Sequence, residues 1–178
     1  MTTVNCVDTY IVPTTANEVT SPSQPAFSAY LGTTDSDVTG DSTIFLIGDT
    51  DIGTAMTEIF DQNNDFNTGS SAGALFTAPV TGRYILIATV GTGDTGACSY
   101  LLPELRTSNR RFYQSDNNPT PTVNTSDESF TRITALAEMD AADTAWFMTR
   151  GDNTTKTLDV LGQAGTNLTT YFMGYLQV

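Results

Sequence analysis

Residues 75–89 encode a strand, a tight corner and a second strand, and this segment restricts the possible folds more than any other. The run is Leu-Phe-Thr-Ala-Pro-Val-Thr-Gly-Arg-Tyr-Ile-Leu-Ile-Ala-Thr. Pro79 cannot donate a ladder hydrogen bond, so it ends the first strand, and Gly82 tolerates the backbone angles of a turn. The apolar run that begins at Tyr84 then predicts a central strand that enters the core.

The rest of the chain after residue 24 is a succession of short strands and turns. No segment has the apolar periodicity and caps of a helix, and this pattern indicates a sandwich or barrel. In the strand predicted at 128–138 the larger apolar side chains do not keep to one face, which predicts partial or two-sided burial. We expect strands at 25–31, 42–48, 55–61, 73–78, 83–90, 97–106, 109–114, 128–138, 144–150, 157–161 and 169–177.

The length and charge of the chain exclude several classes of function. The 178 residues suit one domain, and the formal net charge is −13 with no histidine. A chain this acidic lacks the basic footprint of a nucleic-acid-binding protein, and an anionic membrane surface would repel it. No run approaches the apolar length of a spanning helix, so we expect no membrane insertion. Cys6 and Cys98 are too few for a disulfide framework or a zinc site.

The Phe76-x5-Gly82-x-Tyr84 spacing resembles a signature of the globular head of complement C1q and its relatives, which are jelly rolls related to tumour necrosis factor. The resemblance continues in Gln24–Ala29, in Ile59–Asp61 with Asp65–Asn67, in residues 133–148 and in the closing stretch 170–176. The chain departs from the pattern at Gly69, where an aromatic residue is usual. The resemblance implies an all-β fold, an antiparallel jelly-roll sandwich of about ten strands spanning 25–178.

The same resemblance implies a homotrimer, because relatives bury aromatic residues of the last strand at a three-fold axis. On this basis we expect a trimer seam formed by Tyr84, Leu86, Tyr171, Phe172 and Tyr175. Residues 1–24 are rich in Thr, Asn, Pro and Ser, and we expect an extended arm that docks on a neighbour. Its apolar anchoring residues are Val7, Tyr10, Ile11 and Val12.

Two long polar loops, 61–72 and 114–127, are candidates for binding because loops of this length in a compact domain are usually functional or disordered. In the second loop the candidate binding residues are Asp116, Asn117, Asn118, Thr120, Thr122 and Asn124. In the first loop, Asp61-x-Asn63-x-Asp65 has the oxygen spacing of a calcium loop. Phe66 and Ala72 stand where an EF-hand needs glycine and glutamate, so the default is a solvated acidic loop. Relatives of the fold can bind calcium, which keeps an irregular site open; we expect no other cofactor.

Catalytic motifs are scarce. The absence of histidine excludes every histidine-based triad. Asp94-Thr95-Gly96-Ala97 matches the aspartic-protease signature, but Gly91-Thr92-Gly93 stands where that fold needs an apolar strand, so a hairpin turn is the preferred interpretation. Arg106, Arg110 and Arg111 flank a second predicted turn and could pair with a partner's acids or remain solvated. We therefore expect a protein that is not an enzyme.

The start of the chain lacks a basic segment followed by an apolar run, so we expect no signal peptide. A chain with an N-terminal arm, no export signal and a Thr/Asn/Gly-rich surface resembles tailed-phage structural proteins, which assemble in the host cytoplasm and leave by lysis. The leading hypothesis is a trimeric virion appendage, such as a decoration, head fibre or tail-spike module, held to other virion proteins by its arm. The alternative is a receptor-binding module or adhesin that recognises a host-surface glycan or protein through its exposed loops.

Overall fold

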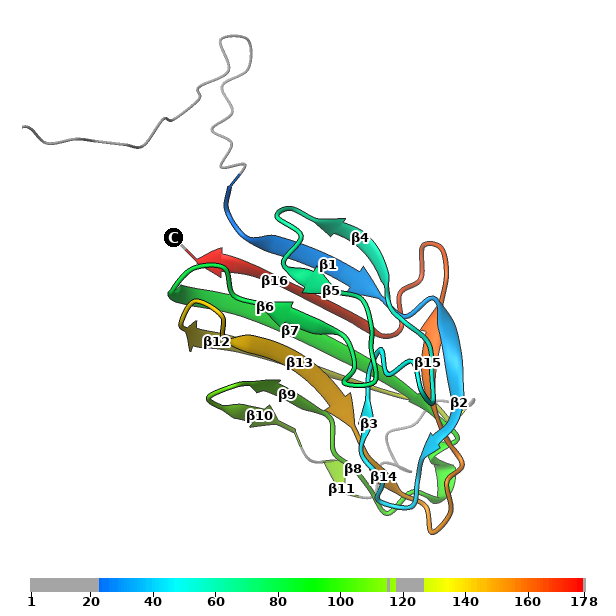
Figure 1. Cartoon of the computed structure of the whole chain (residues 1–178). Helices are drawn as coiled ribbons and strands as arrows, with labels where there is room; N and C mark the ends of the chain where they lie inside the picture. The colour runs from blue at the N-terminus through cyan, green and yellow to red at the C-terminus, as the bar shows by residue number, and fades with distance from the viewer. Residues whose placement is uncertain (1–22, 115, 118–126, 178) are drawn as a thin grey trace, which may run out of the picture.

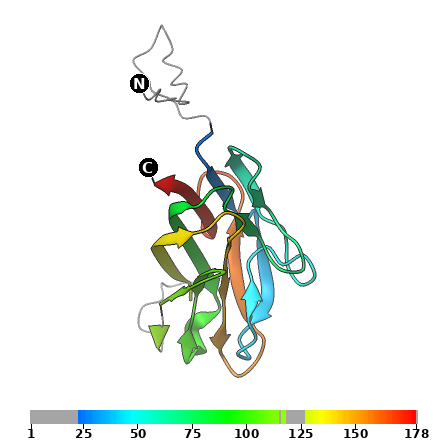
Figure 2. The same cartoon turned by 60° about the vertical axis from the view of Figure 1, so that its left-hand side comes forward.

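The structure is a computed structural model that describes residues 23–114, 116–117 and 127–177. Antiparallel strands form two main layers, which are visible in both Figure 1 and Figure 2. The regular structure of the described residues is otherwise limited to one 3₁₀ turn, η1 (Thr95–Ala97). No helix in these ranges is long and apolar enough to cross a membrane. The fold is therefore the predicted all-β jelly-roll sandwich.

The seven-stranded sheet has the order β2-β15-β7-β16-β1-β4, with β12 paired to the other edge of β7. The central strand β7 is the one predicted from the corner at Gly82. The strands are β1 (Ala26–Tyr30), β2 (Thr33–Thr39), β4 (Thr57–Asp61), β7 (Gly82–Gly93), β12 (Ser129–Met139), β15 (Leu158–Gln163) and β16 (Tyr171–Gln177).

The six-stranded sheet has the order β10-β9-β13-β6-β5, with β3 also paired to β13. A small third sheet has the order β11-β8-β14. The six strands are β3 (Phe45–Leu46), β5 (Phe66–Asn67), β6 (Leu75–Thr77), β9 (Glu104–Thr107), β10 (Arg111–Tyr113) and β13 (Thr144–Thr149). The third sheet contains β8 (Tyr100–Leu101), β11 (Asp116–Asn117) and β14 (Gly151–Asp152).

An aromatic cluster joins the two sheets in the core. Phe27 of β1 stacks on Phe66 and on Phe76, with ring centroids 4.7 Å apart in each pair. Phe172 of β16 meets Phe27 edge-on at 4.9 Å and lies 5.1 Å from Phe147 of β13. Tyr84 is also fully buried, and its hydroxyl donates to the carbonyl oxygen of Val80 at 2.7 Å. Both sheets thus contribute large rings to one interior, as a sandwich requires.

The strand predictions differ from the structure in several places, and the two-residue strands β5, β11 and β14 lie outside the predicted ranges. The single strand predicted at 97–106 is divided, because η1 covers its start and Leu102-Pro103 separates β8 from β9. Strand β2 was not predicted, because its sequence, Thr-Thr-Asp-Ser-Asp-Val-Thr, has little apolar signal. The chain forms a strand there because β15 offers an edge with which it can pair.

Residues 1–22 lie outside the described residues, and with them the predicted anchors Val7, Tyr10, Ile11 and Val12. The described chain begins beside the turn after β4, where the side-chain amide of Asn63 donates to the carbonyl oxygen of Ser23 at 3.3 Å. Gln24 donates to the carbonyl oxygen of Leu176 at 2.5 Å. The division into an arm and a head domain stays a prediction.

Candidate functional site

The outer face of the seven-stranded sheet carries an unusual concentration of apolar side chains. Along β12 burial alternates strictly, so Phe130, Arg132, Thr134, Leu136 and Glu138 all point away from the core. The register aligns three outward residues of neighbouring strands, Leu136 of β12, Ile85 of β7 and Tyr175 of β16. The next row contains Thr134, Ile87 and Met173 in the same order. We call this surface, formed by the outward side chains of β12, β7 and β16, the apolar face.

Several of these side chains are well exposed. Nine large hydrophobic side chains of the described residues are exposed, and Phe130, Leu136 and Tyr175 of the apolar face are among them. Two more of the nine lie on β4, at the far edge of the same sheet. Phe60 pairs with Ser28 of β1, and Ile59 occupies the irregularity in the β1–β4 pairing. Apolar patches of this kind on a protein surface usually mark an interaction site.

Arg132 connects three strands of the apolar face. Its Nε donates to the Thr89 hydroxyl of β7 at 3.2 Å, and its Nη2 donates to the Tyr171 hydroxyl of β16 at 2.5 Å. The guanidinium carbon also lies 5.8 Å from the centre of the Tyr171 ring, within cation–π range. The cation is therefore held flat against the sheet and fixes the orientation of Tyr171.

Three residues of the predicted trimer seam do not lie on the surface of the chain. Tyr84, Leu86 and Phe172 are completely buried in the core of a single chain, so they cannot contact another subunit. Tyr171 and Tyr175 do lie on the outward side of β16. Successive side chains of a strand point to opposite faces, so Phe172 cannot share a surface with Tyr171. Four residues that the sequence analysis did not single out share this outward side, because of the same alternation: Ile85, Ile87, Met173 and Leu136.

The calcium candidates are arranged as a turn. Both carboxylate oxygens of Asp61 accept backbone hydrogen bonds, from Asp65 at 3.1 Å and from Phe66 at 2.9 Å. Burial and the negative charge of Asp61 raise the pKa of Asp65, and Oδ2 of Asp65 has no hydrogen-bond partner. Across the described ranges, no group of three or more His, Cys, Asp or Glu side chains could hold a metal ion. Asp61 thus caps the turn, and nothing in this geometry assigns it to a metal.

An open groove of about 540 Å³ lies beside this turn. Its walls come from β4, from the β4–β5 turn, from β5 and from β6, and Asp65 is one of its lining residues. Glu58 is the other acid among them, and the lining contains no basic side chain. The groove therefore favours neutral or cationic groups over anions.

A buried carboxylate on the outer side of β9 holds two of the arginines. The Glu104 side chain is 1% exposed and accepts from Nε of Arg106 at 2.7 Å and from Nη2 of Arg111 at 2.9 Å. Burial opposes ionisation of Glu104, but the hydrogen bonds from Arg106 and Arg111 outweigh it and lower its pKa. Arg106 and Arg111 are therefore paired within the chain, whereas Arg110 is exposed at the β9–β10 turn.

The protease-like motif lies in a turn, as the sequence predicts. Asp94 is exposed, has a left-handed backbone (φ 57°) and precedes η1. The backbone N–H of Thr95 donates to the carbonyl oxygen of Asp127 at 3.1 Å, and its hydroxyl donates to the same oxygen at 2.7 Å. Asp94 thus belongs to a turn, but not to the predicted hairpin, because the strands on either side, β7 and β8, belong to different sheets.

We expect Asp94→Asn to change the free energy of unfolding by no more than about 0.5 kcal/mol, because the site is exposed and asparagine tolerates the left-handed conformation. Urea unfolding measures this. A pepstatin-sensitive proteolysis at acid pH that disappears in the variant would contradict the assignment of Asp94 to a structural turn.

The predicted binding loop is described only at its base. Asp116 and Asn117 form β11, which pairs with Tyr100–Leu101 of β8. Asn118, Thr120, Thr122 and Asn124 lie outside the described residues. Their role in binding stays a prediction.

No protein-family model and no curated protein matches the chain. Solved structures do match in fold. The globular domain of zebrafish complement 1qA has a TM-score of 0.52 and 18% identity, covering 86% of this chain and 98% of that one. Murine APRIL has a TM-score of 0.53 and 12% identity, covering 86% and 99%. The vertex protein P5 of PRD1 has a TM-score of 0.54 and 10% identity, covering 86% and 97%.

The fold is a C1q- and TNF-like jelly roll. At these identities the likeness shows the fold alone. It confirms what residues 75–89 implied about architecture.

Proposed function

We propose that this protein is a non-enzymatic structural component of a virion, a homotrimeric jelly-roll appendage whose subunits join through the apolar face. The observation that carries the proposal is the alignment of Leu136, Ile85 and Tyr175 across three strands on the outside of the sandwich. A chain with a formal net charge of −13 has ample polar surface to remain soluble. An aligned apolar surface on such a chain is best explained by burial against a partner.

A second copy of the chain is the partner favoured by the composition of this face. Its charged members, Arg83, Arg132 and Glu138, do not give it a strong net charge of either sign. Like copies can therefore approach each other there without the repulsion that their acidic surfaces would otherwise cause. The proposed number of subunits, three, rests on the resemblance to C1q and tumour necrosis factor, and the likeness in fold supports it.

The virion context has separate support. A vertex protein of PRD1, a phage, is among the structures with the same fold. The N-terminal arm has apolar residues but too few of them to form a core, which suits a segment that adds a strand to a neighbouring protein. Under this proposal the arm attaches the appendage to the particle. Capsid, neck or tail genes beside the coding sequence would support this context, and genes for an unrelated pathway would contradict it.

Light scattering on the purified full chain tests the trimer. We expect a mass about three times the chain mass of 19.0 kDa. The apolar face should also be protected from solvent in the assembly, so hydrogen exchange of β12 and β16 should be slow. A monomer at micromolar concentration would contradict the proposal.

The second candidate, a receptor-binding module or adhesin, is favoured by the pairing of β11 with β8. This pairing fixes the base of the loop that follows Asn117 at one end of the sandwich. Replacing residues 118–125 by a Gly/Ser linker separates the two functions. A passive decoration keeps both assembly and host attachment, whereas an adhesin keeps assembly and loses attachment.

A further inference from the structure

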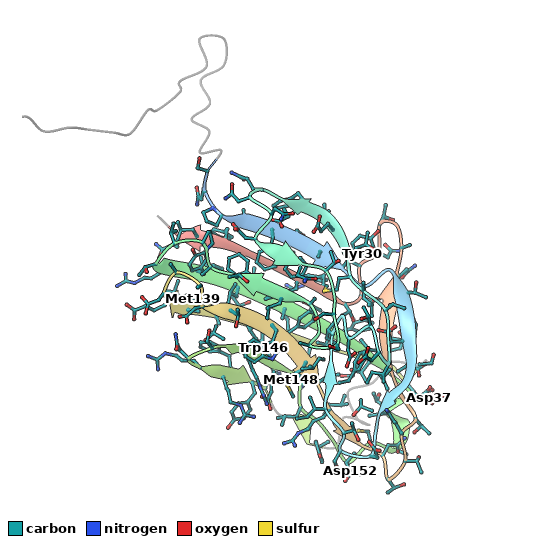
Figure 3. All side chains as sticks on the ribbon, in the orientation of Figure 1. Tyr30, Asp37, Met139, Trp146, Met148 and Asp152 are labelled. Carbon is teal, nitrogen blue, oxygen red and sulfur yellow. The ribbon has the colours of Figure 1, made fainter. Side chains whose placement is uncertain are left out.

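Asp35 is an acidic side chain inside the sandwich. It lies on β2, opposite Val160 of β15, and is 4% exposed. Residues 49–54 fold over it, and we call this segment the capping loop. Asp37, two residues further along β2, is at the end of the molecule away from Met139, the last residue of β12 (Figure 3). Asp35 takes no part in the apolar face.

The carboxylate is held by one residue of the capping loop. Oδ1 of Asp35 accepts from the Thr54 hydroxyl at 2.9 Å, and the Thr54 backbone contributes a further hydrogen bond. Oδ2 has no hydrogen-bond partner. A Cβ added to Gly53 would lie 2.7 Å from this oxygen and 2.8 Å from Cζ of the buried Phe45. The loop backbone therefore lies directly against the carboxylate and leaves no space there for a compensating group.

Among the described residues, the elements that pack on Asp35 contribute no cation that could pair with it. The capping loop contributes Asp49 and Asp51, β2 contributes Asp37, and β15 contributes Asp159, which accepts the backbone N–H of Asp37 at 2.8 Å. All four are acidic, and Asp35 takes part in no ion pair of the described residues. Burial raises the pKa of Asp35, and the hydrogen bonds from Thr54 offset this only in part.

The capping loop is closed on itself and is bound to its neighbours at its two ends. Within the loop, the backbone N–H of Gly53 donates to the carbonyl oxygen of Asp49 at 2.9 Å. At one end of the loop, the backbone N–H of Thr50 donates to the carbonyl oxygen of Ser70 at 3.1 Å. Thr54 holds the other end on β2 through Asp35. Release of this contact would expose the carboxylate to water without breaking a strand.

We propose that Asp35, Gly53 and Thr54 form a proton-controlled latch, in which the capping loop is closed over the neutral carboxyl and lifts when Asp35 gives its proton to solvent. The direction in pH follows from the raised pKa of the folded state. Stability from the closed loop is fully present below the unfolded pKa of about 3.9, and it is lost as pH rises through the folded pKa. The latch is therefore closed in acid and opens toward neutral pH.

Hydrogen exchange of residues 49–54 between pH 4 and pH 8, corrected for intrinsic exchange, tests this in the full chain. We expect protection to fall by up to about tenfold for each pH unit between the unfolded pKa of about 3.9 and the folded pKa, and to level off above it. Asp35→Asn, which cannot ionise, should keep the loop protected throughout. Asp51→Asn removes the same charge from an exposed position and should retain the pH dependence of the natural protein. A pH dependence that is the same in Asp35→Asn and the natural protein would overturn the proposal.

Thr54→Val provides a second test, which distinguishes a pH-dependent role of the Thr54 hydroxyl from simple packing of the loop. The Thr54 hydroxyl stabilises the ionised form in the closed state, so its removal should raise the folded pKa of Asp35 further. The loss of protection should then continue to higher pH and become larger, while protection at pH 4 is kept. Circular dichroism checks that the variant folds. Equal loss of protection at pH 4 and pH 8 would show that Thr54 merely packs the loop, and it would contradict the latch.

Discussion

Leu136→Asp is expected to convert the proposed trimer into folded monomers. Leu136 is 57% exposed in a single chain and lies at one end of a row with Ile85 and Tyr175, so the substitution leaves the core unchanged. In the assembly the same side chain would be buried, and an unpaired buried charge costs several kcal/mol. Each subunit carries the charge, so dissociation at micromolar concentration should be complete.

Light scattering and circular dichroism together measure this outcome. The variant should lose about two thirds of the particle mass and keep its β spectrum. Ile44→Asp is the matched control, because Ile44 is an exposed apolar residue just before β3 of the other sheet. A Leu136→Asp protein that stays trimeric would mean that the apolar face serves a different partner.

The sequence predicted the architecture better than it predicted the surface. The corner from Pro79 to Gly82 and the resemblance built on it implied a jelly roll, and the structure and its fold relatives confirm this. Such a corner is local, because proline and glycine act on their own backbone. Strand β2 shows the opposite case: its polar residues give no local signal, and it exists through pairing with β15 more than 100 residues away in sequence.

The trimer seam shows why site residues are harder to assign than strands. The sequence prediction assigns all three aromatic residues of the last strand, Tyr171, Phe172 and Tyr175, to the seam. Adjacent residues of one strand must face opposite ways, so Tyr171 and Phe172 cannot both lie there. The sequence of β12 predicts partial or two-sided burial, and the structure places Ile133 and Met139 inward with Phe130 and Leu136 outward. Which side of β12 faces inward is set by the opposing sheet, whose residues are far away in sequence, so the sequence of β12 alone does not show it. The buried environment of Asp35 likewise depends on a loop from another part of the chain.

Phe172→Ala should destabilise the subunit itself, in contrast to a substitution on the apolar face. The Phe172 ring is fully buried and touches Phe27, Phe66 and Phe147, so its removal leaves a cavity where the two sheets meet. Truncation of a buried phenylalanine typically costs about 3–5 kcal/mol, which is a large part of the roughly 5–15 kcal/mol that stabilises a domain. The midpoint of urea unfolding should therefore fall sharply.

Tyr171→Ala is the neighbouring control for this prediction. It removes an outward ring and the Arg132 contact, so it should weaken assembly while costing the isolated subunit much less than Phe172→Ala. Unfolding is to be compared in the Leu136→Asp background, where subunit dissociation does not contribute. Equal stability losses for the two substitutions would contradict the assignment of Phe172 to the core and Tyr171 to the surface.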